Sequence, residues 1–135
     1  SGWDVLSEKQ RLIPIINQLK SLGIRTVLFS DHDIDQIEAA HDIGVDRIEI
    51  YTGPYAKAFK ENDLKVIEDY KEAINFAQSI KLDLNAGHDL SLLNLENFLN
   101  LGKIHEVSIG HSLVSESLIY GVQETINKYI NIIGN

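Results

Sequence analysis

The fold of this chain is constrained most by a fourfold alternation of β-rich runs, polar loops and helical patterns. The β-rich runs lie at residues 25–30, 47–51, 81–85 and 106–109, and each leads into polar residues before a helical pattern begins. Strands that alternate with helices in this way form right-handed parallel βαβ units. The carboxyl ends of parallel strands meet at one edge of the sheet, where active sites of such folds lie. We therefore expect the four polar loops to share one edge.

The apolar content of the four strands predicts that they belong to a closed barrel. Four strands are too few to close a barrel by themselves. Val27, Leu28 and Phe29 are consecutive, and the next two runs are rich in Ile and Leu. Strands that are apolar on both faces need cover on both, and open edges are templates for pairing. Closure takes about eight parallel strands. The predicted fold class is therefore α/β, a parallel (β/α)8 TIM-type barrel. Residues 1–135 supply about half of this single domain, as a fragment or as a half that pairs with another.

Capping and glycine signals place the helices between the strands. A capping-box pattern predicts that the first helix begins at Ser7, and Asp33 and Asn94 are expected to cap two later helices. The turn signal after the second strand predicts a loop that reaches to about Asn62. The apolar pattern over residues 112–133 predicts one last helix.

Composition narrows the class of protein. The net charge of −8 argues against nucleic acid or an anionic membrane as the main partner. The chain has no cysteine, which excludes disulfides and suits a cytoplasmic protein. No apolar stretch approaches the roughly 20 residues that a membrane helix needs. Met is absent and the chain opens on Ser1 and Gly2, so we expect a piece of a longer protein.

Residues suited to acid–base and phosphate chemistry stand at three of the predicted strands. Glu49 lies in the second, and the pairs Gly87-His88 and Gly110-His111 follow the third and fourth. Histidine titrates near neutral pH, which suits a proton donor or acceptor. A carboxylate can stabilise positive charge that develops on a substrate. Glycine lets the backbone approach a ligand closely, and free N–H groups at the start of a helix can hold phosphate.

Four motifs, in order and at fitting spacings, resemble the pyridoxine 5′-phosphate synthase family. They are Phe-x-Asp-x-Asp at 29–33, Glu-Ile-Tyr-Thr-Gly-x-Tyr-Ala at 49–56, Asn-Ala-Gly-His at 85–88 and His-Glu-x-x-Ile-Gly-His at 105–111. The resemblance extends from about residue 2 to about residue 133. It corresponds to the C-terminal half of the enzyme, strands five to eight of the barrel.

This resemblance implies an activity and an assembly. The family condenses 1-deoxy-D-xylulose 5-phosphate with 3-amino-2-oxopropyl phosphate to give pyridoxine 5′-phosphate in vitamin B6 biosynthesis. It implies a cytoplasmic homo-octamer of complete barrels that uses no metal and no organic cofactor. Only the complete barrel is expected to be active, because two general bases and an Arg that holds the pentulose phosphate belong to the N-terminal half.

The resemblance also assigns roles to individual residues. Glu49 matches the carboxylate that stabilises transition states, and His88 matches a proton donor. Asp89, Gly110 and His111 match positions that bind the aminoketone phosphate. Asp89 departs from the family pattern, which commonly has Gly there. Because a carboxylate repels a phosphate dianion, only a backbone contact is carried over to Asp89.

Other polar residues of the chain have simpler explanations. His32 lies at the same edge, but the family motif does not require a histidine there, and we leave it out of the site. Asp31 and Asp33 are expected to serve a turn and a helix cap. His105 falls at the amino end of its strand, the face that serves stability in barrels, and His41 falls on a helix surface.

Two other functions remain open from the sequence. A metal-dependent isomerase or aldolase barrel acting on a small phosphorylated substrate is one, because Glu49, His88, Asp89 and His111 are acceptable ligands for a hard metal ion. None of them has the spacing of a known metal motif. A non-catalytic half-barrel module is the other, and a complete barrel upstream of this sequence would argue against it.

Overall fold

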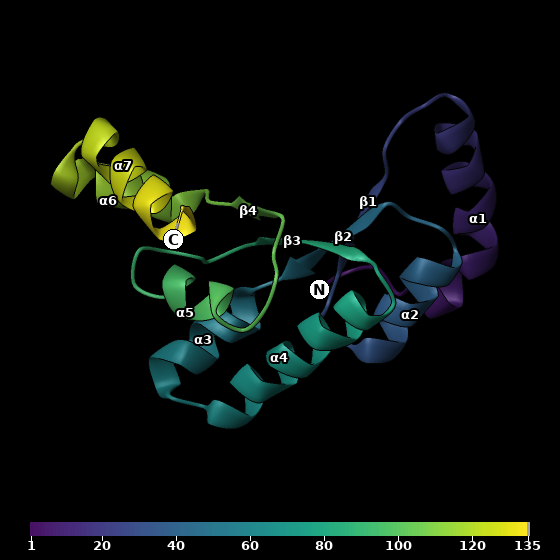
Figure 1. The fold of residues 1–135 in the computed structure, drawn as a ribbon, viewed down its shortest axis with the longest axis horizontal. Helices are drawn as coiled ribbons and strands as arrows, with labels where there is room; N and C mark the ends of the chain where they lie inside the picture. The colour runs from purple at the N-terminus through teal and green to yellow at the C-terminus, as the bar shows by residue number, and fades with distance from the viewer. Residues whose placement is uncertain (135) are drawn as a thin grey trace.

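The structure of this chain, a computed structural model that describes residues 1–134, is a parallel β-sheet packed against helices (Figure 1). In chain order its elements are α1 (Val5–Ser21), β1 (Val27–Ser30), α2 (Ile34–Asp42), β2 (Arg47–Tyr51), α3 (Gly53–Glu61), α4 (Leu64–Ser79), β3 (Asp83–Gly87), α5 (Leu95–Leu99), β4 (Glu106–Ser108), α6 (His111–Tyr120) and α7 (Val122–Ile133). None of the helices in residues 1–134 is both long and apolar enough to cross a bilayer.

The sheet has the strand order β1-β2-β3-β4, and every neighbouring pair is parallel. The prediction of four parallel strands, adjacent in chain order, is therefore confirmed. Phe29 and Asn85 flank Glu49 on the two neighbouring strands. Gly87 pairs with Ser108. The carboxyl ends of the strands consequently share one edge. We call this edge the rim, formed by residues 31–33, 51–53, 88–90 and 109–111.

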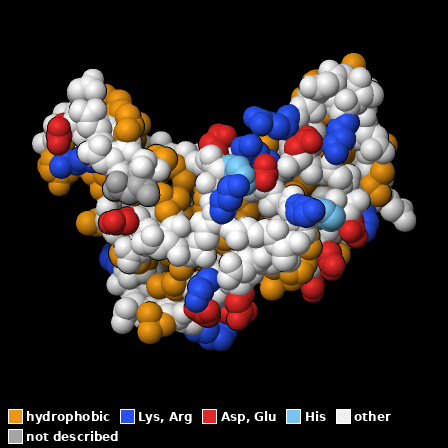
Figure 2. All heavy atoms as spheres, viewed as in Figure 1, with side chains coloured by type: hydrophobic (Ala, Val, Ile, Leu, Met, Phe, Trp, Pro, Cys, Tyr) orange, Lys and Arg blue, Asp and Glu red, His pale blue; other side chains and the backbone are white. Residues whose placement is uncertain are grey.

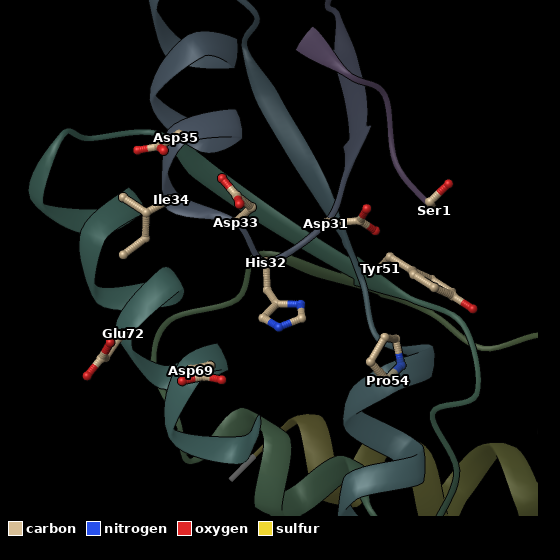
Figure 3. A pocket seen from close by; sticks show the side chains of 10 residues that line it. All are labelled: Ser1, Asp31, His32, Asp33, Ile34, Asp35, Tyr51, Pro54, Asp69 and Glu72. Carbon is tan, nitrogen blue, oxygen red and sulfur yellow. The ribbon is translucent and has the colours of Figure 1, made fainter. Parts of the chain in front are cut away.

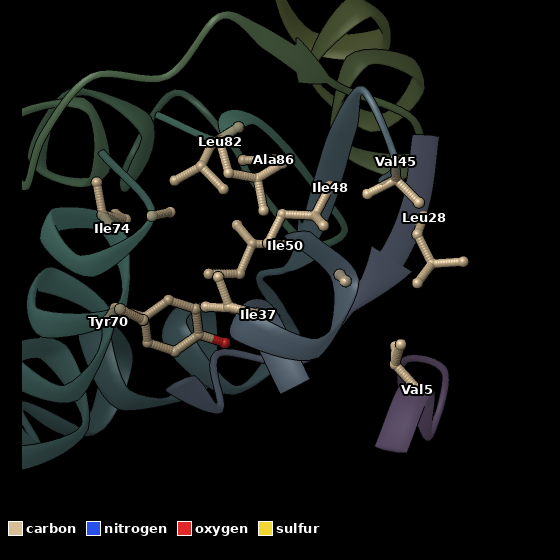
Figure 4. Packing of buried hydrophobic residues seen from close by; sticks show 14 of the residues in the cluster. Val5, Leu28, Ile37, Val45, Ile48, Ile50, Tyr70, Ile74, Leu82 and Ala86 are labelled. Carbon is tan, nitrogen blue, oxygen red and sulfur yellow. The ribbon is translucent and has the colours of Figure 1, made fainter. Parts of the chain in front are cut away.

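The residues of β2 alternate between two different faces of the sheet. Ile48 and Ile50 are fully buried, and Figure 4 shows them on the side of the sheet where Tyr70 of α4 lies. Arg47 and Glu49 belong to the opposite face and are half-buried. The expectation that the strands are apolar on both faces is therefore wrong for β2, because the face that turns away from the helices carries charge.

Three aromatic side chains form the centre of the core under the rim. Tyr55, Tyr70 and Phe98 are fully buried, with the ring centroids of Tyr55 and Phe98 4.8 Å apart. The hydroxyl groups of the two tyrosines both form hydrogen bonds, and that of Tyr70 donates to the carbonyl oxygen of Tyr51. The Tyr55 O–H donates to the carbonyl oxygen of Asn94 at 3.0 Å, and burial raises the pKa of Tyr55 to about 12. The core thus holds the backbone at Tyr51 in the rim and at Asn94 shortly after it.

The helix starts agree with the sequence in part. Asp33 caps α2, its carboxylate accepting from the backbone N–H of Gln36 at 3.1 Å, which confirms the predicted cap. The first helix begins at Val5 rather than Ser7, because Asp4 is the capping residue. Asn94 stands before α5 but makes no capping bond. Its side chain binds the preceding loop instead.

Two predicted connections are wrong. The loop expected from Thr52 to about Asn62 is mostly the helix α3, because Pro54 begins a helix there rather than a turn. The single last helix is two helices, α6 and α7. They separate at Gly121, whose φ of 83° and ψ of 150° no helix can contain.

The pair α6 and α7 exposes many apolar side chains. Figure 2 shows apolar atoms gathered at the end of the molecule where these two helices lie. The exposed apolar residues of this pair are Val114, Leu118, Ile119, Tyr120, Val122, Ile126, Ile130 and Ile133. The sheet edges at β1 and β4 likewise have no strand paired to their outer side within residues 1–134.

Candidate functional site

Glu49 of β2 and Gly87 of the adjacent strand β3 lie side by side on the charged face of the sheet. A β-carbon placed on Gly87 would come within 2.7 Å of Glu49 Oε1 and 3.2 Å of the Ser108 β-carbon. The first distance is shorter than real β-carbons show, so any side chain at position 87 would displace the Glu49 carboxylate from this position. This explains why β3 ends in glycine, and it places Glu49 beside the residue that precedes His88.

His88 follows β3 at the rim, and its imidazole packs against two aromatic rings. The ring centroids of His88 and Phe29 are 5.1 Å apart, and those of His88 and Tyr51 are 5.2 Å apart in an edge-on arrangement. Phe29 and Tyr51 also contact each other at 5.6 Å. Residues from β1, β2 and the loop after β3 therefore meet here. His88 itself is exposed, so a substrate above the rim can reach the imidazole.

The loop that carries His88 has an unusual backbone conformation. His88 has a φ of 84° and Asp89 a φ of 57°, in the left-handed region that residues with side chains rarely adopt. Thr52 and Asn94, both buried, donate side-chain hydrogen bonds to carbonyl oxygens of this loop. Asp89 is exposed, so its carboxylate is directed to solvent and only its backbone is held.

The sequence reasoning missed Thr52, Asn94 and the ring of Tyr51 as parts of this site. The sequence predicts Thr52 as one residue of a turn and Asn94 as a helix cap. A polar residue directly after a parallel strand is the only signal that could have indicated Thr52. Nothing in the local sequence of Asn94 separates a cap from a loop support.

Gly110 and His111 lie at the rim after β4, at the start of α6. Gly110 holds the position before the helix, where no side chain caps the free N–H groups. A β-carbon on Gly110 would meet nothing within 4 Å, and both residues are exposed. Within residues 1–134, no hydrogen bond, ion pair or ring contact joins either residue to Glu49 or His88. The structure thus places the pair at the same rim but not in contact with the other two side chains.

His32, which we left out of the site, lies beside a cavity of about 710 Å³ at the β1 end of the rim (Figure 3). Its imidazole stacks on the ring of Tyr70, with centroids 4.1 Å apart and planes 16° from parallel. Burial lowers the pKa of His32 and outweighs the opposing effect of Asp69 and other nearby carboxylates. The carboxylates that line this cavity are those of Asp31, Asp33, Asp35, Asp69 and Glu72. So acidic a cavity does not suit a phosphorylated substrate.

The opposite end of the charged face holds a group of ion pairs. Arg47 contacts Asp83 at 3.7 Å and Glu106 at 3.9 Å, and its guanidinium donates to Asn85 Oδ1 at 3.3 Å. His105 lies 3.1 Å from Asp83 at the amino end of β4, where we expected a structural histidine. Since this end lies away from the rim, the charges there stabilise the sheet rather than bind a substrate.

The residues proposed as metal ligands are not assembled in the described part of the chain. Across residues 1–134, no three His, Asp or Glu side chains lie close enough together to hold one metal ion. Glu49, His88, Asp89 and His111 therefore do not form a complete ligand set by themselves. Any metal-dependent isomerase or aldolase reaction would need ligands from outside these residues.

Comparison with known proteins gives a consistent result over the whole chain. Residues 1–135 match the family described as "Pyridoxal phosphate biosynthesis protein PdxJ". The chain is 42% identical over 132 residues to a pyridoxine 5′-phosphate synthase of Bacteroides thetaiotaomicron, which covers 97% of this chain and 56% of that protein.

Two further relatives with the same name agree. The synthase of Cytophaga hutchinsonii is 43% identical over 132 residues, which covers 96% of this chain and 55% of that protein. The synthase of Parabacteroides distasonis is 44% identical over 130 residues, with the same two coverages of 96% and 55%. The chain thus spans about half the length of the curated relatives it matches.

Proposed function

Because this chain belongs to the family of the pyridoxal phosphate biosynthesis protein PdxJ, we propose that it supplies the C-terminal half of a pyridoxine 5′-phosphate synthase. Its strands β1–β4 are then strands five to eight of a (β/α)8 barrel. The observation that carries this proposal is that Glu49 lies against Gly87, the residue that precedes His88 at the carboxyl edge of a parallel sheet. Active sites of such barrels are built at this edge.

The proposed reaction condenses 1-deoxy-D-xylulose 5-phosphate with 3-amino-2-oxopropyl phosphate. Such a condensation forms a carbon–nitrogen bond, eliminates phosphate and water, and closes a ring, and each step moves a proton. His88 donates a proton from an exposed imidazole whose orientation is fixed by Phe29 and Tyr51. Glu49 stabilises positive charge on the intermediates from a half-buried position, where a charge acts more strongly than in water.

The phosphate of the aminoketone is proposed to bind at the start of α6 and beside the loop of residues 87–89. The first N–H groups of α6 have no capping side chain, and Gly110 leaves open space above them. Titration of the isotope-labelled chain with inorganic phosphate should shift the amide resonances of residues 110–113 and 88–90. Shifts confined to Lys57 and Lys60 of α3 would place the anion elsewhere and contradict this assignment.

The complete barrel needs a second half. The free edges of β1 and β4 and the exposed apolar face of α6 and α7 are the surfaces that this half would cover. Closure would also enclose the charged face, which carries Arg47 and Glu49. The complete enzyme is proposed to act in the cytoplasm as a homo-octamer, as the family resemblance implies.

The proposal is tested by joining this chain to the part of the Bacteroides thetaiotaomicron synthase that the 132-residue match leaves uncovered. The purified fusion, checked for a cooperative unfolding transition, should form pyridoxine 5′-phosphate from the two substrates. The chain alone should form none, because half of the groups the reaction needs are not in it. A folded fusion without turnover, or one whose turnover survives His88→Asn together with Glu49→Gln, would overturn the proposed function.

A further inference from the structure

Thr52 is a fully buried polar residue whose hydrogen bonds go to the loop that carries His88. Its backbone N–H donates to the carbonyl oxygen of Gly87 at 2.9 Å. Its hydroxyl group lies 2.6 Å from the same oxygen and also within reach of the His88 carbonyl oxygen, so one proton is shared between two acceptors. Thr52 precedes α3 but makes no capping bond to it. The hydroxyl group therefore supports the loop and not its own helix.

Asn94 supports the same loop with two further hydrogen bonds. Its Nδ2 donates to the carbonyl oxygen of Asp89 at 3.1 Å, and its Oδ1 accepts from the backbone N–H of Ser91 at 2.8 Å. With the contacts of Thr52, this means that three successive carbonyl groups, those of residues 87–89, accept hydrogen bonds from buried side chains. Neither Thr52 nor Asn94 needs to touch a substrate to act on the loop.

The loop requires such support because of its backbone. His88 and Asp89 both have positive φ, which is unfavourable for residues that carry a β-carbon. Unfavourable backbone conformations persist only where the surrounding structure imposes them. Without the hydroxyl group of Thr52, the His88 carbonyl would be free to turn. The imidazole would then move away from the rings of Phe29 and Tyr51.

We propose that Thr52 is a positioning residue, which fixes the His88 imidazole for proton donation by holding the two carbonyl groups on either side of the His88 α-carbon. This inference rests on the proposed role of His88. Thr52 directly follows β2, the strand that holds Glu49. The same segment therefore supplies the proposed charge-stabilising carboxylate and the residue that positions His88. Proton donation by His88 takes place after the substrates have bound. Loss of the correct His88 position should therefore lower kcat and leave KM nearly unchanged.

The test compares two variants of Thr52 with a matched control variant in the fusion protein described above. Thr52→Val keeps the shape of the side chain and removes the hydroxyl group, and its kcat should fall by roughly 10- to 100-fold. Thr52→Ser keeps the hydroxyl group and should restore most of the turnover. Thr125→Val is the matched control, because Thr125 is equally buried and donates to the Gly121 carbonyl oxygen at 2.9 Å, away from the rim. Its kcat should equal that of the parent.

A second measurement separates positioning from general stability. Nuclear Overhauser effects between the ring protons of His88 and Tyr51 should be present in the parent, Thr52→Ser and Thr125→Val proteins and lost in Thr52→Val. If Thr52→Val does not fold, the comparison of Thr52→Ala with Thr52→Ser answers the same question. A parent-like kcat with intact ring contacts in the variants that lack the hydroxyl group would overturn the inference.

Product formation and the His88 ring contacts distinguish an error in the proposed function from an error in the role of Thr52. If the parent fusion folds and forms no product, the proposed function is wrong. The ring contacts of His88 still report whether Thr52 fixes the loop. If the fusion is active and the ring contacts do not depend on Thr52, only the positioning role is wrong.

Discussion

The carboxylate of Glu49 occupies the space in which any residue other than glycine at position 87 would carry its β-carbon. Glu49 belongs to β2 and Gly87 to β3, and Gly87 pairs with Tyr51, two residues after Glu49, in the register of these strands. Gly87 immediately precedes His88, so the backbone of Gly87 adjoins both the Glu49 carboxylate and the residue that carries the imidazole. A change at Gly87 should therefore disturb both side chains.

The first prediction concerns Gly87→Ala. The added methyl group forces the end of the Glu49 side chain aside and crowds the Ser108 β-carbon, so the free energy of unfolding should fall by about 1 kcal/mol, the low end of the range for overpacking. Denaturant titration of the chain measures this loss. In the fusion protein, turnover should fall as well, because the carboxylate leaves its position.

The shorter carboxylate of Asp supplies the control for that prediction. Glu49→Asp leaves room for the methyl group, so Gly87→Ala should destabilise the Glu49→Asp protein less than it destabilises the parent. This non-additivity is expected of two residues in contact. Equal losses in the two backgrounds would mean that Glu49 does not occupy the space beside Gly87.

Replacing the two proposed reacting groups should affect chemistry more than folding. His88→Asn in the fusion protein should lower turnover by roughly 10² to 10⁴, the range for a lost acid or base. Substrate binding, measured separately, should change much less. Glu49→Gln should act in a similar way, through lost charge stabilisation. Near-parental turnover of His88→Asn would show that His88 is only a loop residue.

The half-buried imidazole of His32 should make stability depend on pH. Burial lowers the pKa of His32 although Asp69, Asp31 and Asp33 oppose the shift. The unfolded chain therefore binds this proton more readily than the folded chain. Stability should rise with pH through the window below about 6.5, and it should be lost as the pH falls through that window.

His32→Phe tests this pH dependence. Phenylalanine can keep the stacking on Tyr70 but cannot titrate, so the free energy of unfolding should vary less with pH below about 6.5. The quantity to compare is the slope of stability against pH, measured by denaturant titration at several pH values. An unchanged slope in the variant would assign the pH dependence to other groups.

Gly121 should be hard to replace. Its φ of 83° and ψ of 150° lie in a region that is almost exclusive to glycine. Although open space surrounds the position, Gly121→Ala should lower the free energy of unfolding by about 1–3 kcal/mol through backbone strain alone. Gln123→Ala, on the exposed side of α7, is the matched control and should change stability by less than about 0.5 kcal/mol.

The strand order could be predicted because the alternation of strands and helices is a property of the local sequence. The cap at Asp33 could be predicted for the same reason. The start of α3 was missed because Thr52-Gly53-Pro54 is compatible with a turn and with a helix start, and packing of Tyr55 into the core favours the helix. Gly121 was missed because one glycine inside an apolar helical pattern does not by itself end a helix.

The arrangement of the proposed site could be predicted only in part. The residue types of Glu49, in β2, and His88, directly after β3, mark them as candidates. That Glu49 lies against Gly87 depends on the register between β2 and β3, which no pattern within a single strand specifies. The support by Thr52 and the stacking of His32 on Tyr70 are likewise contacts between distant segments. Such contacts follow from the tertiary fold rather than from local preference.

The strand order has a consequence for how this part of the chain reaches its structure. Each strand of the sheet pairs with the strand that comes next in the sequence, so every new pairing closes only one helix-containing loop. The entropy lost on closing a loop grows with loop length, and chains with short-range contacts fold faster than chains with long-range contacts. The sheet can therefore grow by adding one βα unit at a time. In the proposed barrel, the slow step would then be the joining of β1 and β4 to strands contributed by the other half.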